Sequence, residues 1–343
     1  MPTFKVTDEA HWLSLRGQHI GGSDVSALFN RWMTPDGSTV VLHAYEEVPE
    51  GAIPLGSCSP YTTAYALWLE KAGKVMPNDF AANERVAAGT FLEPALADWA
   101  KSKWGWKLRK VKRYDTHPTI EGWGASVDYE VHGIGMEPVE FKNVDGLVFM
   151  RDWQTDPDDR DVVSVPPLHI ILQLQHYIGA RGAAAGWITC CIGGNRLVRG
   201  RFERHEPTIA RIGQAIEAFW RGVRAGIAPN DTPFDAVKEE FAYGEAVDEA
   251  QAVDLSDDAE AAMLARRLMR WKKHLDFTDT YLDRTKGKLA VKVGTKTKAR
   301  GDGFKISWPV IERAEKMIPA RLQTAATYRG GFTVTELKEK KPK

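Results

Sequence analysis

Hydrophobic and polar residues alternate over residues 124–143, and this pattern predicts a β-hairpin. Its apolar positions and turn glycines are Val127, Tyr129, Val131, Gly133, Gly135, Val139 and Phe141. Side chains two residues apart on a strand share a face, so Glu140 and Lys142 are expected to point the same way. The facing strand would bring Asp128 beside them.

Two carboxylates and one ammonium group on one strand face suit a cation site better than a hydrophobic core. Mg²⁺ binds carboxylate oxygens and water, and a neighbouring lysine can orient that water or offset the charge of a phosphate. The alternative interpretation is a solvated face with a cross-strand ion pair. The hairpin alone leaves both interpretations open.

The N-terminal segment 8–30 predicts a helix that stops at Gly17 and a second helix that follows a pair of glycines. Ser23 or Asp24 would be the N-cap of the second helix. Its free N–H groups would form an anion site, which Arg16 would complete as a bidentate clamp. The alternative is an ordinary capped helix with a surface arginine.

Proline and glycine are dense over residues 34–60, which predicts a loop-like insertion or a mobile flap. Amphipathic periodicity predicts helices over residues 61–73 and 83–101, the second with a break at Pro94. Glu93 lies among apolar residues of that helix, and a buried carboxylate requires a partner or a metal. The alternative is a first-turn glutamate that interacts with the helix dipole.

Residues 101–114 are basic, with Trp104 and Trp106 interleaved. The segment would either track a phosphate backbone and stack on a base, or form a half-buried strand with a solvated basic face. Its composition does not separate these two interpretations. Residues 144–165 are polar and rich in aspartate, and we expect a loop there.

A helix is predicted from Leu168, directly after two prolines. Gln173 and Gln175 lie about 200° apart on it, so only one of them can face a given site. An amide near a metal can position water or a phosphate oxygen, whereas a plain surface glutamine is the alternative. A second hairpin over residues 186–203 and a helix over residues 206–225 are predicted next.

The composition of the chain excludes several classes of protein. Its 343 residues are 43% hydrophobic, which is ample for a sizeable core. The formal net charge is zero, so any nucleic-acid surface must be local. Three cysteines exclude a four-cysteine zinc or iron–sulfur site within one chain and suggest a reducing cytosol. No apolar segment predicts a signal peptide or a membrane span.

A change in charge divides the chain into residues 1–229 and a C-terminal appendage over residues 230–343. The appendage is acidic first and basic later. We expect a long helix over residues 257–286, a basic hairpin over residues 286–300 and a strand near Phe304. Charge runs are usually solvated faces, but this polarity suggests an appendage that docks or contacts DNA.

Taken together, these segments resemble the lambda-exonuclease / YqaJ-type viral recombinase family, a branch of the PD-(D/E)XK nucleases. The resemblance extends over most of residues 10–229 and depends on the order of short motifs. In chain order these are Trp12-x-x-x-Arg16, Ile20-Gly-Gly-Ser-Asp24, Leu67-Trp-Leu-Glu-Lys-x-Gly73, Gly89-Thr-x-Leu-Glu-Pro94, Ser126-x-Asp128, Glu140-x-Lys142, Gln173-x-Gln175, Gly193-Gly-Asn195 and Glu217-x-Phe-Trp220. The resemblance implies an α/β fold of the α+β type, with a central mixed sheet flanked by helices.

By this resemblance, Asp128 and Glu140 are ligands for Mg²⁺ or Mn²⁺, and Lys142 is the catalytic lysine. Glu93 would bind the metal directly or through water, and Gln173 would lie near the metal and its water. The pocket for a terminal phosphate would consist of Arg16, Ser23 and Ser126.

The resemblance further implies a cytoplasmic enzyme, encoded by a phage or prophage, that digests linear double-stranded DNA from a 5′ end and leaves a 3′ overhang. Such enzymes work with a single-strand-annealing protein, and lambda-type relatives form ring-shaped trimers. The alternatives are a related endonuclease, a non-catalytic DNA-end-binding or annealing protein, and an iron–sulfur single-strand exonuclease, which the cysteine count opposes. Asn143 departs from the Cys or Thr that often follows the lysine, and segment 34–60 is longer than expected.

Overall fold

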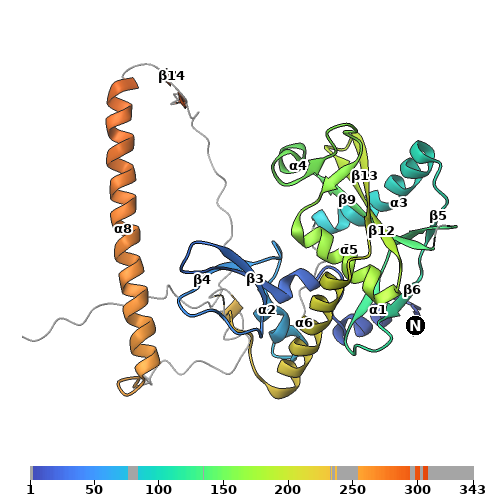
Figure 1. The fold of residues 1–343 in the computed structure, drawn as a ribbon, viewed down its shortest axis with the longest axis horizontal. Helices are drawn as coiled ribbons and strands as arrows, with labels where there is room; N and C mark the ends of the chain where they lie inside the picture. Colours follow the sequence, from blue (N-terminus) through green and yellow to red (C-terminus); the bar gives the residue numbers. More distant parts are fainter. Residues whose placement is uncertain are drawn as a thin grey trace, which may run out of the picture. The chain divides into compact units, whose positions relative to one another are not determined.

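The computed structural model describes residues 3–75, 84–133, 135–231, 233, 236–237, 254–293, 298–301 and 304–307. The chain divides into two compact units, Met1–Gly244 and Glu245–Lys343, and each is described by itself. The functional boundary expected after residue 229 remains a prediction. Figure 1 shows the elements of both units.

A five-stranded mixed sheet forms the centre of the first unit (Figure 1). In spatial order its strands are β13 (Arg196–Glu203), β12 (Ala185–Ile192), β9 (Glu137–Val144), β8 (Tyr129–Val131) and β5 (Leu108–Lys110). Strand β12 runs parallel to β9, and the other neighbours are antiparallel. Both predicted hairpins are therefore present, as the β8–β9 and β12–β13 pairs.

Helices cover both faces of this sheet, because alternate strand residues pack against different helices. On one face, Ala97 of α3 (Glu84–Trp104) packs with Tyr129 and Val139. On the other face, Leu174 of α5 (Leu168–Arg181) packs with Ile188 in a larger core that also includes α6 (Glu206–Ala225). The predicted mixed sheet flanked by helices is confirmed.

The expected first strand of the β8–β9 hairpin is divided between two sheets. Strand β7 (Gly124–Ser126) pairs with β6 (Arg113–Thr116), which also pairs with β1 (Thr3–Lys5). The chain crosses from this three-stranded sheet to the central sheet just before Tyr129, where β8 begins. Asp128 therefore lies at the junction of the two sheets rather than within a strand.

The N-terminal segment follows the prediction only in part. Helix α1 (Glu9–Gly17) ends at the expected glycine. The second helix is a single 3₁₀ turn, η1 (Val25–Leu28), which passes directly into strand β2 (Phe29–Met33). The expected second helix is thus limited to one turn, because the aromatic residues Phe29 and Trp32 that follow belong to a strand.

The loop predicted over residues 34–60 is also wrong, since it contains two strands. Strand β2 pairs with β3 (Thr39–His43) on one side and with β4 (Ile53–Ser57) on the other. Pro54 lies in β4, at the edge of this sheet, where its missing N–H is tolerated. The glycines that suggested a loop, such as Gly51 with φ 74°, serve the turns between strands.

Two further segments differ from the prediction. Residues 144–165 hold α4 (Gly146–Asp152), whose first turn is capped by the side chain of Asp145, and the strand pair β10 (Gln154–Thr155) and β11 (Val163–Val165). Helix α3 continues through Pro94 instead of breaking there. The helix predicted over residues 61–73 is α2 (Ala64–Lys71).

The second unit contains helix α8 (Ala259–Val293) and a hairpin of β14 (Lys298–Gly301) and β15 (Phe304–Ser307). The predicted long helix is thus present and extends beyond residue 286. The basic hairpin expected over residues 286–300 is wrong in position, because helical structure continues to Val293.

All three cysteines are buried and unpaired, as expected for a chain without a disulfide framework. No helix in the described ranges combines the length and the apolar character needed to cross a membrane.

Candidate active site

Glu140 and Lys142 lie on one face of β9, as their spacing predicts. The Nζ atom of Lys142 is 2.7 Å from Oε1 of Glu140, and it donates a hydrogen bond of 3.0 Å to Oε1 of Gln173 on α5. Gln175 points elsewhere and donates to the backbone oxygen of Glu203 at 2.7 Å. Only the first glutamine therefore faces this cluster.

Asp128 joins the same cluster from the end of β8. Continuing the β8–β9 register by one step, from the pair Tyr129 and Val139, places Asp128 opposite Glu140. Burial, together with the nearby carboxylates of Glu140 and Glu93, raises the pKa of Asp128 to about 8. Ionisation of this carboxyl group is unfavourable because no positive charge balances it fully. A bound cation would supply that charge, so the site favours cation binding.

Glu93 approaches the cluster from α3, on the other side of the sheet edge. Its side chain is 19% exposed and forms an ion pair with Lys110 of β5, with 3.4 Å between Nζ and Oε1. The neighbouring Phe91 is 82% exposed, so Glu93 is not the deeply buried carboxylate that its apolar neighbours suggested. Lys110 was not singled out from the basic segment that contains it, although it also interacts with Asp128.

These carboxylates fit a Mg²⁺ ion that retains much of its water. Within the described part of the chain, no three His, Cys, Asp or Glu side chains lie close enough to form a complete metal cage. Mg²⁺ is typically held by one or two carboxylates, several waters and substrate phosphates rather than by such a cage. Asp128 and Glu140 supply two carboxylates, and Glu93 supplies a third nearby.

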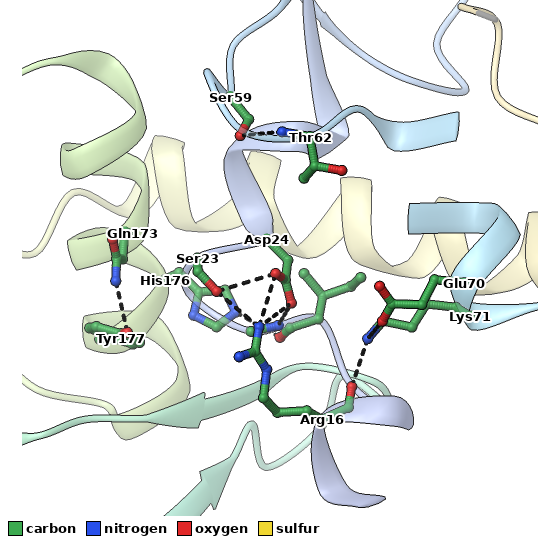
Figure 2. A network of polar contacts seen from close by, with 12 residues as sticks. Arg16, Ser23, Asp24, Ser59, Thr62, Glu70, Lys71, Gln173, His176 and Tyr177 are labelled. Atoms are coloured by element: carbon green, nitrogen blue, oxygen red, sulfur yellow. Dashed lines mark hydrogen bonds and ion pairs between the residues drawn. The ribbon is translucent and has the colours of Figure 1, made fainter. Parts of the chain in front are cut away.

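Tyr177 connects the cluster to the N-terminal segment (Figure 2). Its hydroxyl accepts a hydrogen bond of 2.9 Å from Nε2 of Gln173, which fixes the orientation of that amide. Burial raises the pKa of Tyr177 well above its ordinary value, and the charges of Glu140 and Asp128 act in the same direction. The sequence analysis missed this tyrosine, although its i+4 spacing from Gln173 on a predicted helix was a usable signal.

Arg16 points towards Ser23 and Asp24 in a second polar cluster (Figure 2). Its Nη2 atom donates to Oγ of Ser23 at 3.1 Å and to Oδ1 of Asp24 at 3.2 Å. Asp24 also accepts a hydrogen bond from the backbone N–H of Gly21 at 3.2 Å. Asp24 occupies the N-cap position of η1, as expected, although its side chain makes no capping hydrogen bond there. A terminal phosphate in this pocket would have to share the guanidinium with Asp24.

Ser126 is joined to the same pocket through Trp12. The Nε1 atom of Trp12 donates to Oγ of Ser126 at 3.2 Å. The guanidinium of Arg16 lies over the ring of Trp12, 4.9 Å from its centroid. The structure therefore brings the three predicted phosphate-pocket residues together, with a tryptophan that the sequence analysis did not include in the pocket.

The tryptophans of segment 101–114 pack into the fold. Trp104 and Trp106 lie 4.9 Å apart, and Trp106 contacts Trp187 of β12 at 4.7 Å between ring centroids. The guanidinium of Arg199 lies over all three rings. This arrangement favours the half-buried interpretation of the segment over a base-stacking surface.

Three residues of α5 at four-residue spacing, Gln173, Tyr177 and Arg181, form one stripe towards the central sheet. Arg181 at the far end forms buried ion pairs with Glu130 and with Asp115, the latter at 3.1 Å between Nε and Oδ2. Burial raises the pKa of Glu130, but hydrogen bonds from Arg181 and Arg109 outweigh this and hold the pKa below its ordinary value. The sequence analysis did not identify these buried charges.

Several solved structures are similar to this chain at low sequence identity. LHK-Exo, an alkaline exonuclease from Laribacter hongkongensis, is similar at 19% identity and a TM-score of 0.44, over 68% of this chain and 98% of that chain. A crystal structure of LHK-Exo in complex with dAMP matches at 20% identity and a TM-score of 0.43, with the same coverage. SSO0001 matches at 16% identity and a TM-score of 0.25, over 39% of this chain and 60% of that one. No curated protein matches the chain significantly.

The family model of the YqaJ-like viral recombinase domain matches residues 52–184. This range contains the whole cluster, namely Glu93, Asp128, Glu140, Lys142 and Gln173, whereas Arg16 and Ser23 precede it. The resemblance recognised in the sequence is confirmed: residues 52–184 are identified as a YqaJ-like viral recombinase domain.

Proposed function

We propose that this chain is a Mg²⁺-dependent exonuclease that digests one strand of linear double-stranded DNA from its 5′ end. The observation that supports this function best is the convergence of Asp128, Glu140 and Lys142 beside Gln173 in a recombinase-type domain. Carboxylates next to an ammonium group are suited to phosphodiester hydrolysis.

Asp128 and Glu140 would hold Mg²⁺ or Mn²⁺, and Glu93 would bind it directly or through water. When bound, the ion supplies positive charge that lowers the pKa of water and stabilises the leaving 3′ oxygen. Lys142 supports the nucleophile and offsets the charge that develops on the phosphate. Gln173 holds the lysine in place through the 3.0 Å hydrogen bond, and Tyr177 fixes Gln173 in turn.

Arg16, Ser23 and Ser126 would bind the phosphate at the 5′ end of the digested strand. Arg16 is held by Trp12 and Asp24, so its guanidinium is oriented before DNA arrives. A pocket for a terminal phosphate favours digestion from an end over cleavage within a strand. The product would be a duplex with a 3′ single-stranded overhang.

We further propose, by resemblance to the family, that the overhang is passed to a single-strand-annealing protein during recombination in the cytoplasm. A ring-shaped trimer is the expected assembly of the exonuclease part. Its partners would thus be DNA ends, the annealing protein and copies of the same chain.

The test is digestion of linear duplexes that carry a 5′-phosphate or a 5′-hydroxyl, beside a covalently closed circle of the same sequence. We expect Mg²⁺-dependent release of mononucleotides from the phosphorylated linear duplex and an intact circle. Cleavage of the circle would indicate an endonuclease. DNA binding without digestion in either Mg²⁺ or Mn²⁺ would indicate a non-catalytic protein, and full activity in EDTA would refute the metal.

A further inference from the structure

Two lysines, Lys110 and Lys142, lie beside the candidate metal-binding carboxylates, on opposite faces of the central sheet. Lys142 faces α5, where it donates a hydrogen bond to Gln173. Lys110 is paired in register with Tyr129, which packs with Ala97 of α3. Side chains directly opposite one another on neighbouring strands share a face, so Lys110 faces α3. The two ammonium groups therefore approach the carboxylates from different sides.

The two lysines differ in how firmly their side chains are held. Lys142 lies 2.7 Å from Glu140, donates a second hydrogen bond to Gln173 and is 26% exposed. Lys110 lies 3.4 Å from Glu93 and is 53% exposed, whereas a charge-assisted hydrogen bond is usually about 2.7–2.9 Å long. A long, partly exposed ion pair contributes little to stability. Lys110 can therefore exchange its partner at little cost, whereas Lys142 is fixed.

The backbone keeps Lys110 beside the cluster whichever partner its side chain has. The N–H group of Val111 donates to the backbone oxygen of Asp128 at 2.8 Å, so the end of β5 is attached to the residue that carries the central carboxylate. Burial lowers the pKa of Lys110, but the charge of Glu93 and further interactions with its neighbours outweigh this and raise the pKa. The ammonium group is thus protonated at neutral pH.

We propose that Lys110 binds a backbone phosphate of the DNA, next to the phosphate that is hydrolysed, after Mg²⁺ has displaced it from Glu93. This inference rests on the proposed function, in which Glu93 binds the ion. A carboxylate whose charge is offset by Mg²⁺ attracts a lysine less strongly. The flexible stem of Lys110 then lets its ammonium group reach another anion, and every nucleotide of a DNA strand supplies one. Because Lys142 serves the reacting phosphate from the other face, a neighbouring phosphate fits Lys110.

This exchange of partners makes ion binding and DNA binding depend on each other. Lys110 competes with the ion for Glu93 when DNA is absent, and it adds a phosphate contact when the ion and DNA are both bound. The ion should therefore raise the affinity for DNA, and DNA should raise the affinity for the ion by the same factor. Removal of Lys110 should strengthen ion binding without DNA and weaken DNA binding with the ion. A purely structural ion pair would not produce these opposite effects.

The first experiment measures Mg²⁺ binding without DNA by titration calorimetry for the wild type, Lys110→Ala and Lys101→Ala. Lys101→Ala is the matched control, because Lys101 forms an ion pair with Asp98 on the same helix, α3. We expect Lys110→Ala to bind Mg²⁺ about two- to fivefold more tightly than the wild type, as the loss of one competing exposed ion pair allows, and the control to bind it as the wild type does.

Two results of this titration would overturn the inference in different ways. Equal Mg²⁺ affinity of all three proteins would overturn the exchange and leave the proposed ion site intact. A wild type that does not bind Mg²⁺ would overturn the proposed ion site and the exchange with it.

The second experiment measures the affinity for a linear duplex at several salt concentrations, in EDTA and in Ca²⁺, which also binds carboxylate oxygens. In Ca²⁺ we expect Lys110→Ala to bind DNA more weakly and to reduce the steepness of the salt dependence by about 0.9, the contribution of one phosphate contact. In EDTA it should match the wild type. Lys110→Arg retains the positive charge and should retain the wild-type salt dependence.

Equal losses of DNA affinity in EDTA and in Ca²⁺ would show that Lys110 contacts DNA without leaving Glu93, and would overturn the exchange. No loss in either solution would overturn the phosphate contact and leave the ion pair with a structural role, which a lower melting temperature of Lys110→Ala would then reveal.

Discussion

Gly22 packs directly against the ring of Tyr177. A Cβ atom at residue 22 would lie 2.3 Å from Cε1 and 2.9 Å from the hydroxyl oxygen of that tyrosine. The tyrosine is buried, and its hydroxyl accepts the hydrogen bond that orients Gln173. Gly22, the second glycine of the pair in the N-terminal segment, is thus needed for close packing beside the candidate active site.

Gly22→Ala should therefore displace Tyr177 and misorient Gln173. We expect a loss of about 1–3 kcal/mol in the free energy of unfolding, as for other overpacked sites, and a larger loss in cleavage rate than in DNA affinity. Denaturant titration and single-turnover digestion measure the two effects. Gly17→Ala is the control, because a Cβ there meets nothing within 4 Å. Equal behaviour of the two variants would argue against this packing role.

Lys142→Ala should abolish cleavage while leaving DNA binding nearly intact. The lysine lies between Glu140 and Gln173, where it would offset charge in the transition state of the proposed reaction, and loss of one such group typically costs about 10²–10³ in rate. Lys101→Ala is the matched control, since Lys101 also pairs with a carboxylate, Asp98, but is 41% exposed on α3. Retention of more than a tenth of the activity in Lys142→Ala would contradict the assigned role.

Arg16→Ala should remove the preference for a 5′-phosphate over a 5′-hydroxyl end. The expected change is a rise in KM for the phosphorylated duplex with little change for the hydroxyl duplex, because in the proposed function the arginine would contact only the terminal phosphate. The ratio of kcat/KM for the two substrates measures it. Arg151→Ala, which removes an exposed arginine paired with Asp152, should leave the ratio unchanged. An unaltered ratio in Arg16→Ala would assign the phosphate pocket elsewhere.

Asp128→Asn should stabilise the metal-free chain at alkaline pH. The folded-state pKa of Asp128, about 8, lies above its ordinary value of 3.8, so the stability contributed by its proton is lost as pH rises through this interval. At pH 8 in EDTA we expect the variant to be more stable by on the order of 1–3 kcal/mol, with a smaller difference near pH 5. Thermal unfolding measures this.

Addition of Mg²⁺ should make the wild type more stable than Asp128→Asn. The wild type should gain stability on addition of Mg²⁺, whereas Asp128→Asn should gain little, because ligand binding stabilises only the folded state that binds it. Asp98→Asn, at an exposed ion pair, should behave like the wild type throughout. A wild type that is insensitive to Mg²⁺ at pH 8 would count against the proposed ion site.

Local patterns were sufficient for the part of the site that lies on one strand and one helix. Alternation placed Glu140 and Lys142 on one face, and the helical period separated Gln173 from Gln175. Both conclusions depend only on the geometry of a single element, which the residue spacing determines. The arrangement of Asp128 opposite Glu140 followed from the hairpin between them.

Contacts between distant elements could not be predicted in this way. Lys110 and Tyr177 belong to the cluster only because β5 pairs with β8 and α5 packs on β9, and no local pattern encodes that packing. Segment 34–60 was misassigned because proline and glycine signal turns but do not exclude short edge strands between them. The exposure of an apolar residue such as Phe91 likewise cannot be predicted from the sequence pattern alone.

The ion pairs of Arg181 have a consequence for where inactivating substitutions should occur in this chain. Gln173 and Arg181 are two turns apart, about 12 Å along the axis of α5, yet both are anchored to the same sheet. Rotation of α5 about its axis is thus restrained at both ends. The orientation of the Gln173 amide therefore depends on the ion pairs of Arg181 at the other end of the helix. Substitution of Glu130 or Asp115 should therefore abolish the proposed hydrolysis without altering the surface that would contact DNA. Inactivating substitutions should then occur in two separate groups, one around the metal-binding carboxylates and one around Arg181.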